Sequence, residues 1–333
     1  MSLQNDLARS QAIYERLENA GVKRVLLAYK NSLKEMQSEL ADFYRRYEVA
    51  GSMSYADAVK YNRLINLEKG IANEINGLGK TQVALIVVAL GGIYAENYYR
   101  TTYAVDNEIR RGFAAKLNVS KLMDAQIKAA VANKVTGITE WPELAMGNIK
   151  GFEKTITNAI TRGIIQGQSY PEMARGIKGF YDKEAWKAER IMRTEGHRVR
   201  EQGTQNAYEA AEEAGVDMMK EWSSTLDGRT RDEHGTADGQ PRKVTEPFDV
   251  GGEKMMFPGD SSLGASAYNL VNCRCSSNPV IDGAAPAMRR VRLSDEEYAR
   301  RKEEAGDVPV SRSEVVPYKT YDQWADDKGI KRK

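Results

Sequence analysis

The chain has 333 residues, of which 29% are charged, and its formal net charge is only +2. This length favours two domains and a tail over a single domain. The near-balanced charge excludes a uniformly basic protein that coats DNA, so any contact with nucleic acid must be a local patch. The polar first residues lack the basic, apolar and small-residue segments of a signal peptide, so we expect a protein made in the cytoplasm and not exported by that route.

The first part of the chain has the periodicity of helices. Between Val22 and Tyr47, apolar residues recur at alternating steps of four and three, which predicts a long helix with a seam like that of a coiled coil. Gly51 ends this pattern, and Ser54 followed by Asp57 predicts the start of a second helix, whose apolar face covers residues 64–78. We expect the two helices to form an antiparallel hairpin.

Two glycines, Gly77 and Gly79, are expected to break the second helix before an apolar run at residues 83–95. As a helix this run would span about 20 Å, which is short of the roughly 30 Å of a bilayer's hydrocarbon core. The run is therefore predicted to be a buried core helix with no stable membrane span, and a membrane contact is the alternative. Residues 1–135 together are predicted to form a helical packing domain.

A cluster of Gly and Pro at residues 137–142 predicts a domain boundary. Beyond it, apolar residues from Ile149 to Ile164 outline a helix, and the stretch Ser169–Glu172 predicts a capping box at the start of the next one. A long helix is then expected from about residue 183 to residue 214, with Gly215 as its C-terminal cap.

After Gly215 the helical periodicity disappears, and Gly, Pro, Asp and Ser become frequent between Ser223 and Pro279. We therefore expect a mainly α N-terminal domain followed by an α+β C-terminal domain, at residues 136–283, with short strands and long ordered loops. Residues 284–333 are rich in charge and are predicted to form a tail with one short helix after Ser294. Aromatic residues in this tail predict a docking peptide, although an ordinary frayed terminus explains them equally well. These residues are Tyr318, Tyr321 and Trp324.

Polar and metal-competent residues gather between Trp222 and Cys275 beyond what a surface loop needs. The segments, in chain order, are Arg193-Thr194-Glu195, Asp227-Gly228-Arg229-Thr230-Arg231 with His234 and Asp238-Gly239 after it, Phe257-Pro258-Gly259-Asp260, and Asn272-Cys273-Arg274-Cys275. Each segment alone occurs widely by chance, but the four in this order are specific. Over about residues 140–281 they resemble the signature of the Mu F-like phage minor head proteins.

The resemblance implies a protein of the virion, present in few copies at or near the portal vertex, that acts in head morphogenesis, capsid assembly, and genome packaging or DNA ejection. The expected partners are the portal protein, capsid or scaffold proteins, and packaged phage DNA. The expected location is the head interior or the portal vertex, after assembly in the host cytoplasm. Residues 136–283 would be the Mu F-like minor head protein domain and residues 284–333 a charged docking tail. The structural cluster predicted to stiffen the domain comprises Arg193, Glu195, Trp222, Asp227, Arg229, Arg231, His234, Asp238, Asp260, Asn272 and Arg274.

The two cysteines and two histidines of the chain all fall in this predicted domain, which raises the question of zinc. Cysteines separated by one residue rarely meet the geometry of a disulfide, so they are either free thiols or metal ligands. The predicted metal ligands are His234, Cys273, Cys275 and His197. Asp227 or Asp238 is an alternative fourth ligand. The other interpretation is a polar core without metal, in which arginines pair with carboxylates and the thiols are simply buried.

Three arginines recur at steps that place them on one face of the long helix, together with His197. One interpretation is that they face DNA phosphates, to which they would lend sequence-independent affinity. The other, which we favour, is that they pair with carboxylates of their own domain. The arginines are Arg190, Arg193 and Arg200, and the carboxylates are Glu189, Glu195 and Glu201.

No catalytic residue is predicted, because the sequence has no nucleophile elbow, no His-Glu-x-x-His helix and no phosphate-binding glycine loop. We therefore expect that the protein is not an enzyme. One alternative is a metal-dependent hydrolase or nuclease acting on the phage genome, because His234 is followed and preceded by Asp residues. A second is a virion-delivered effector scaffold, which we disfavour because the roughly fifty residues after the domain are too few for an ordinary folded toxin.

Overall fold

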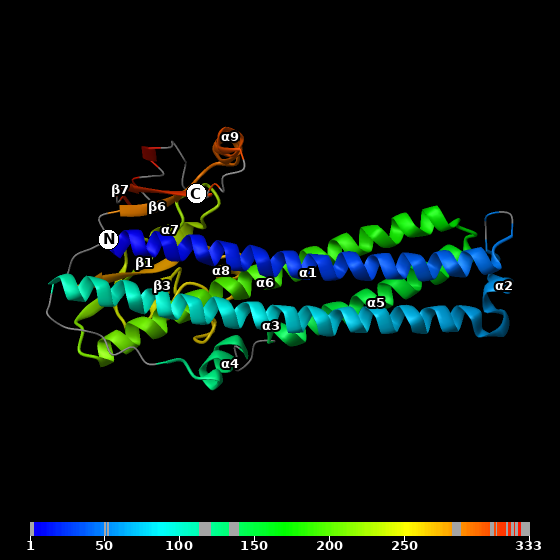
Figure 1. Cartoon of the computed structure of the whole chain (residues 1–333), viewed down its shortest axis with the longest axis horizontal. Coiled ribbons are helices and arrows are strands. Elements are labelled where there is room, and N and C mark those ends of the chain that lie inside the picture. The colour runs from blue at the N-terminus through cyan, green and yellow to red at the C-terminus, as the bar shows by residue number, and fades with distance from the viewer. Residues whose placement is uncertain are drawn as a thin grey trace. The chain divides into compact units, whose positions relative to one another are not determined.

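The computed structural model describes residues 3–49, 51, 53–112, 121–132, 140–281, 288–306, 310, 312–317, 319, 320, 323, 326 and 327. Long helices come first and are followed by short antiparallel strands and loops (Figure 1). The predicted fold class is thereby confirmed. The aromatic residues of the predicted docking tail, Tyr318, Tyr321 and Trp324, lie outside the described residues.

The elements have the following bounds. The long and medium helices are α1 (Leu3–Tyr47), α2 (Tyr55–Val59), the 3-10 turn η1 (Lys60–Asn62), α3 (Arg63–Gly112), α4 (Asp124–Ala132), α5 (Trp141–Ile165) and α6 (Tyr170–Glu213). The later helices are α7 (Asp232–Thr236), α8 (Ala267–Leu270) and α9 (Asp295–Ala305). The strands are β1 (Met218–Ser223), β2 (Pro241–Lys243), β3 (Phe248–Val250), β4 (Glu253–Met255), β5 (Ser276–Ile281), β6 (Met288–Arg292) and β7 (Ser313–Pro317).

The described chain divides into two compact units. Unit 1 takes its residues from the ranges 1–18, 90–131 and 194–333, and unit 2 from the ranges 19–89 and 132–193. The helices α1, α3 and α6 contribute to both units, so neither unit is one continuous stretch of chain. The predicted domains are sequential instead, and that division stays a prediction.

Unit 2 is built from α2, η1 and α5 together with segments of α1, α3 and α6. The hydroxyl of Tyr29 on α1 donates to Gln82 on α3 at 2.6 Å, and a Cβ on Gly21 would lie 3.0 Å from that of Ala89. Residue numbers that rise along α1 therefore meet numbers that fall along α3, which confirms the predicted antiparallel hairpin (Figure 1). The predicted seam of α1 also packs inward, because its residues Val22, Tyr29, Met36, Leu40 and Phe43 are all buried.

The second predicted helix differs from expectation at both of its ends. Ser54 does cap α2, accepting from the backbone N–H of Asp57 at 3.1 Å, but α2 ends after one turn and η1 follows before α3 begins. The predicted break at Gly77 and Gly79 was wrong, since α3 continues through both residues. A Cβ on Gly79 would lie 2.9 Å from the side chain of Ile149 on α5. The close approach of two helices explains a glycine that the sequence pattern suggests is a helix breaker.

Helix α6 is continuous where two helices were expected. The predicted capping box is present at its start, where the backbone N–H of Ser169 donates to the Glu172 carboxylate at 2.8 Å. This bond and that from the Ser169 hydroxyl lower the pKa of Glu172. At the other end Gly215 adopts a φ of +88° and its N–H donates to the Glu212 carbonyl at 2.9 Å, as predicted for a C-terminal cap.

Unit 1 holds an antiparallel sheet in the order β2-β1-β5, with β1 at its centre. One apolar cluster joins this sheet to α3 and α6, and its members are Val105, Ile109, Tyr208, Ala211, Met218, Val244 and Ile281. A second cluster is formed by strands β1, β3 and β4 and the loops around them, and its members are Trp222, Ala237, Phe248, Val250, Met255, Ala265, Cys273 and Cys275. The second cluster contains the two cysteines and so places them in a small apolar core.

One helical stretch of the described residues, Tyr55–Arg110, has the length and composition to cross a membrane, and 39% of its apolar window is buried within the protein. Core helices that never meet lipid satisfy the same criterion. The stretch therefore does not identify a membrane span.

Candidate metal centre

Strand pairing brings the two cysteines to the histidine. Strands β1 and β5 pair antiparallel with Trp222 opposite Ser277 and Ser223 opposite Ser276. Cys275, directly before β5, therefore lies where β1 ends, and the chain that leaves β1 returns after eight residues as α7, which carries His234. The geometry of the sheet thus converts residues 41 apart in the sequence into neighbours.

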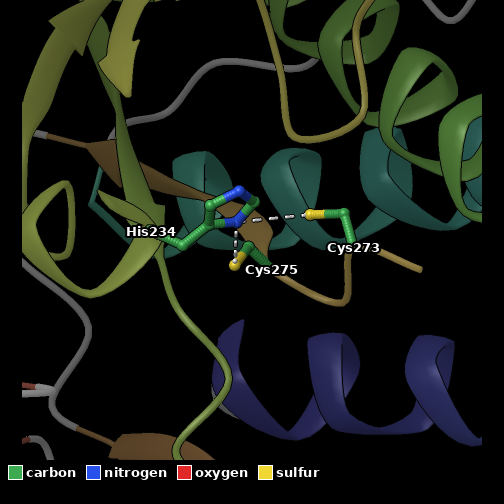
Figure 2. A group of neighbouring side chains, drawn as sticks. All are labelled: His234, Cys273 and Cys275. Carbon is green, nitrogen blue, oxygen red and sulfur yellow. Dashed lines mark hydrogen bonds between the residues drawn. The ribbon is translucent and has the colours of Figure 1, made fainter. Parts of the chain in front are cut away.

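Figure 2 shows His234 with the two thiols on one side of its ring. The Nδ1 atom lies 3.3 Å from the sulfur of Cys275 and 3.7 Å from that of Cys273. These three atoms lie within 4.8 Å of one another, and the three residues are only 2–4% exposed. Both cysteines are free thiols. The sequence prediction placed these three residues together, and the structure brings them into one buried site.

The other ring nitrogen of His234 has an amide partner. Its Nε2 lies 3.1 Å from Oδ1 of Asn269, whose own Nδ2 donates to the carboxylate of Glu253 at 2.8 Å. Because the amide nitrogen faces the carboxylate, the amide oxygen must face the ring, so Nε2 carries the proton. The lone pair of Nδ1 therefore points to the sulfurs. The bond from Asn269 also lowers the pKa of Glu253.

Burial and mutual hydrogen bonding give the two thiols different pKa values. The bond toward Cys275, together with burial, raises the pKa of the Cys273 thiol. Burial also acts to raise the pKa of Cys275, but the hydrogen bond from the Cys273 thiol acts in the opposite direction, and the pKa of Cys275 lies well below its ordinary value. Cys275 is therefore the sulfur that loses its proton first.

An ion pair fixes the segment that carries the cysteines. Arg274 binds the Asp227 carboxylate with both terminal nitrogens, one of them at 2.8 Å. Burial acts to raise the pKa of Asp227, but the hydrogen bonds and charge of Arg274 hold it below its ordinary value. The carbonyl of Arg274 also accepts from the Thr225 hydroxyl at 2.7 Å, and Arg231 donates to the carbonyl of Val271 at 2.6 Å. These bonds hold the cysteine segment against the loop between β1 and α7.

A second brace fixes the loop from the histidine's side. The carboxylate of Asp238 accepts from the backbone N–H of Ser224 at 2.7 Å, and the indole of Trp222 donates to the Ser224 hydroxyl at 3.1 Å. That hydroxyl in turn donates to the carbonyl of His234. The indole ring packs edge-on against the imidazole, with centroids 5.6 Å apart. Asp238 therefore holds the backbone of the loop. Neither Asp238 nor Asp227 belongs to the metal-competent group, which consists of His234, Cys273 and Cys275.

Several predicted residues lie elsewhere. His197, the fourth predicted metal ligand, is buried on α6 and is not in the metal-competent group of the described residues. A Cβ on Gly259 would lie 3.2 Å from its ring, so the Phe257–Asp260 segment packs on His197 instead. Asp260 folds that segment by accepting from the backbone N–H groups of Met256 and Ser262 at 2.9 and 2.8 Å.

The remaining members of the predicted cluster have local partners. Glu195 pairs with Arg198 at 2.7 Å, and the backbone N–H of Arg229 donates to Asp227 at 2.9 Å. Asn272 adopts a φ of +57°, and its backbone N–H donates to Thr194 at 3.4 Å. Arg193 belongs to unit 2.

The three predicted DNA-facing arginines do not share one environment. Arg190 lies over the ring of Trp186 at 4.7 Å, and Arg193 pairs with Glu189 at 2.9 Å, both in unit 2. The side chain of Arg200, in unit 1, is only 12% exposed, pairs with Glu201 at 3.0 Å and lies over an aromatic ring. For Arg200 the predicted DNA-facing role was wrong, because its charge is taken up inside the protein.

Sequence reasoning missed Asn269, Glu253 and Lys220. Nothing in the sequence marks the first two, since single polar residues are common in a segment so rich in Gly, Pro, Asp and Ser. Lys220 had a signal, because in a strand it alternates onto the same face as Met218 and Trp222. The structure indeed buries it fully, with its ammonium 2.7 Å from the carbonyl of Met256.

Comparisons with known proteins match the region of this site. The family model described as Phage Mu protein F like protein matches residues 154–278, which include all three residues of the candidate centre. The chain is 31% identical over 274 residues to the minor head protein GP7 of Bacillus phage SPP1, a match that covers 82% of this chain and 86% of that protein. It is 27% identical over 328 residues to the NAD(+)--arginine ADP-ribosyltransferase EFV of Enterococcus faecalis (strain ATCC 700802 / V583), and this match covers 96% of the chain but 59% of that relative. No solved structure matches significantly.

Proposed function

This chain belongs to the Mu F-like phage minor head proteins, and from that membership we propose that it acts at or near the portal vertex, in head assembly and in genome packaging or ejection. The observation that carries the proposal is the 31% identity that extends over 86% of a minor head protein. A match over 274 residues extends beyond the Mu F-like region, residues 154–278, into other parts of the chain. The portal protein and capsid or scaffold proteins are the proposed partners, and the virion is the location where they meet.

Co-purification with the portal protein of the same phage tests this role. Two variants each remove one exposed aromatic ring, Tyr61→Ser from unit 2 and Tyr103→Ser from unit 1, where the residues are 85% and 53% exposed. Tyr61 also has a φ of +55°, an uncommon conformation for a bulky residue. We expect the wild-type chain to co-elute with the portal ring and one of the variants to bind less, which identifies the unit in contact. A wild-type chain that binds no head component would contradict the proposal.

Contact with packaged DNA is proposed for Arg190 and Arg193 only. Both lie on α6 in unit 2, and the side chain of Arg193 is 39% exposed. A double substitution of both to Gln is expected to weaken DNA binding. The slope of the logarithm of the binding constant against the logarithm of the salt concentration should become shallower by about 1 for each phosphate contact that is lost. Arg45→Gln is the matched control, because that side chain is 76% exposed on α1. Equal salt slopes for all three proteins would exclude this face.

We infer that the protein works without catalysis. The transferase activity in the name of the Enterococcus relative belongs to a protein of which this chain matches 59%. The metal-competent residues are almost fully buried, which does not favour a hydrolase that must admit a substrate. The chain is therefore expected to release no nicotinamide from NAD⁺ above the buffer rate when an arginine analogue is present. Release that rises with protein concentration would overturn the inference.

A further inference from the structure

We propose that His234, Cys273 and Cys275 bind one zinc ion, which links α7 to the segment before β5 and stabilises the second apolar cluster of unit 1. The proposal concerns the folding of the Mu F-like region and stands apart from the portal role. It rests on distances, charge balance and the environment of the three side chains.

The distances suit tetrahedral zinc. With Zn–S bonds of about 2.3 Å and a Zn–N bond of about 2.0–2.1 Å, a tetrahedral angle places nitrogen and sulfur roughly 3.5 Å apart. The measured separations of Nδ1 from the two sulfurs, 3.3 and 3.7 Å, lie on either side of that value. The two nitrogen–sulfur separations therefore need to change by only tenths of an ångström to reach the zinc geometry, and the two sulfurs lie within 4.8 Å of each other.

The charges balance inside an apolar site. On binding, each thiol loses its proton to solvent while two Zn–S bonds and one Zn–N bond form, and no electron is transferred. Two thiolates and a neutral imidazole give the dication a net charge of zero. An uncharged centre is the kind that a core of Trp222 and Phe248 accepts without a large desolvation cost. Soft sulfur donors with one imidazole also favour zinc over calcium or magnesium.

The histidine is already oriented for a metal. Metal-binding imidazoles usually donate their second N–H to a carbonyl or carboxylate, which fixes the ring and its tautomer. Asn269 accepts from Nε2 of His234 and is held in turn by Glu253. The backbone of Glu253 lies in β4, so the hairpin of β3 and β4 sets the ring orientation. Asn269 is a positioning residue, because it acts on the ligand and not on the metal.

The fourth position is assigned to a neutral oxygen donor such as water. Among the described residues, no other His, Cys, Asp or Glu joins the group. A fourth carboxylate would also give the buried centre a negative charge. Three protein ligands are enough to join two chain segments that regular structure supports poorly, since α7 and α8 have five and four residues. Metal binding at such a site adds directly to folding free energy.

Elemental analysis and cobalt substitution of the full-length protein test the proposal. After dialysis against zinc and then against buffer, the wild-type chain is expected to retain about one equivalent of zinc. The double variant Cys273→Ser/Cys275→Ser is expected to retain at least tenfold less. His197→Gln is the matched control and should retain zinc like the wild type, because His197 lies outside the group. Asn269→Ala should keep the site but bind zinc about 10–100-fold more weakly in competition with a chelator.

Measurements on the wild-type protein test zinc binding even if the cysteine variant does not fold. Cobalt added to metal-free wild-type protein is expected to produce the visible bands of tetrahedral cobalt with thiolate ligands. A wild-type chain that retains no zinc and gives no such bands overturns the proposal. Zinc retained equally by the double cysteine variant overturns the ligand assignment. Portal binding is measured separately, so a failed zinc test leaves the proposed function to its own experiment.

Discussion

Replacing the buried lysine of β1 tests the electrostatics of unit 1. Lys220 has no exposed surface, and its ammonium contacts the Gln205 side chain at 3.0 Å and the Met256 carbonyl at 2.7 Å. Burial lowers the pKa of Lys220 to about 8, against the partial compensation of nearby carboxylates. In the unfolded chain the pKa returns to about 10.4. We therefore compare wild-type protein with Lys220→Met as the pH rises.

The direction in which the free energy of unfolding changes with pH follows from proton binding. Between the folded pKa of about 8 and the unfolded value, the unfolded chain holds more protons, so the wild-type protein gains stability as pH rises through this window. Below pH 8 the folded protein carries the full cost of a buried cation. The two pKa values predict a gain of about 2.5 kcal/mol between pH 7 and pH 10. Lys220→Met has no such group, so the free energy of unfolding of wild type minus variant should rise by that amount.

Urea denaturation at several pH values from 7 to 10 measures this difference. Tyrosines that titrate at high pH affect both proteins alike and cancel in the subtraction. Lys178→Met is the matched control, because the Lys178 side chain is 59% exposed and its substitution removes no buried cation. A wild-type minus Lys220→Met difference that stays constant from pH 7 to 10 would refute the reasoning, since Lys220 would then keep its ordinary pKa.

Three further substitutions test packing and pairing. Gly203→Ala would place a Cβ 2.8 Å from the Tyr94 carbonyl oxygen. Overpacking should cost about 1–3 kcal/mol and so exceed the gain of about 1 kcal/mol in helix propensity, which lowers the Tm. A higher Tm would contradict this close approach. Asp227→Asn should lose about 2 kcal/mol at pH 7. Because the folded pKa of Asp227 is lowered, its ion pair stabilises above about pH 4, and in urea titrations the difference from wild type should shrink as pH falls below that value. Trp222→Ala should cost about 3–5 kcal/mol by denaturation, whereas a loss under 1 kcal/mol would show that the fully buried indole is not central to its cluster.

Local rules predicted most of the helical structure. The apolar steps from Val22 onward identified the inward face of α1, and Ser169 and Gly215 marked real helix ends. These features depend on residues within one or two turns, so the sequence contains them. The prediction that Gly79 breaks the helix was wrong because the role of this glycine depends on a residue far away in the sequence. Its meaning depends on Ile149, seventy positions away, which no local pattern reveals.

Part of the candidate centre is likewise predictable from the sequence, and part depends on contacts far along the chain. The family motif drew attention to His234 and both cysteines, but it gave no means to separate them from His197. Only the pairing of β1 with β5 decides which histidine meets the sulfurs, and that pairing is a long-range contact. The roles of Asn269 and Arg200 depend equally on neighbours far along the chain, one through His234 and the other through the ring of Tyr14.

The discontinuous make-up of unit 1 has a consequence for biosynthesis. Val105 and Ile109 on α3 belong to a core that also needs Tyr208 and Ile281. While the ribosome is still translating the second half, those α3 side chains lack their native neighbours from α6 and β5, and contacts between residues so far apart in the sequence form slowly. The nascent chain must therefore carry exposed apolar surface until β5 emerges. A chaperone or prompt capture by an assembling particle is the natural safeguard for that interval.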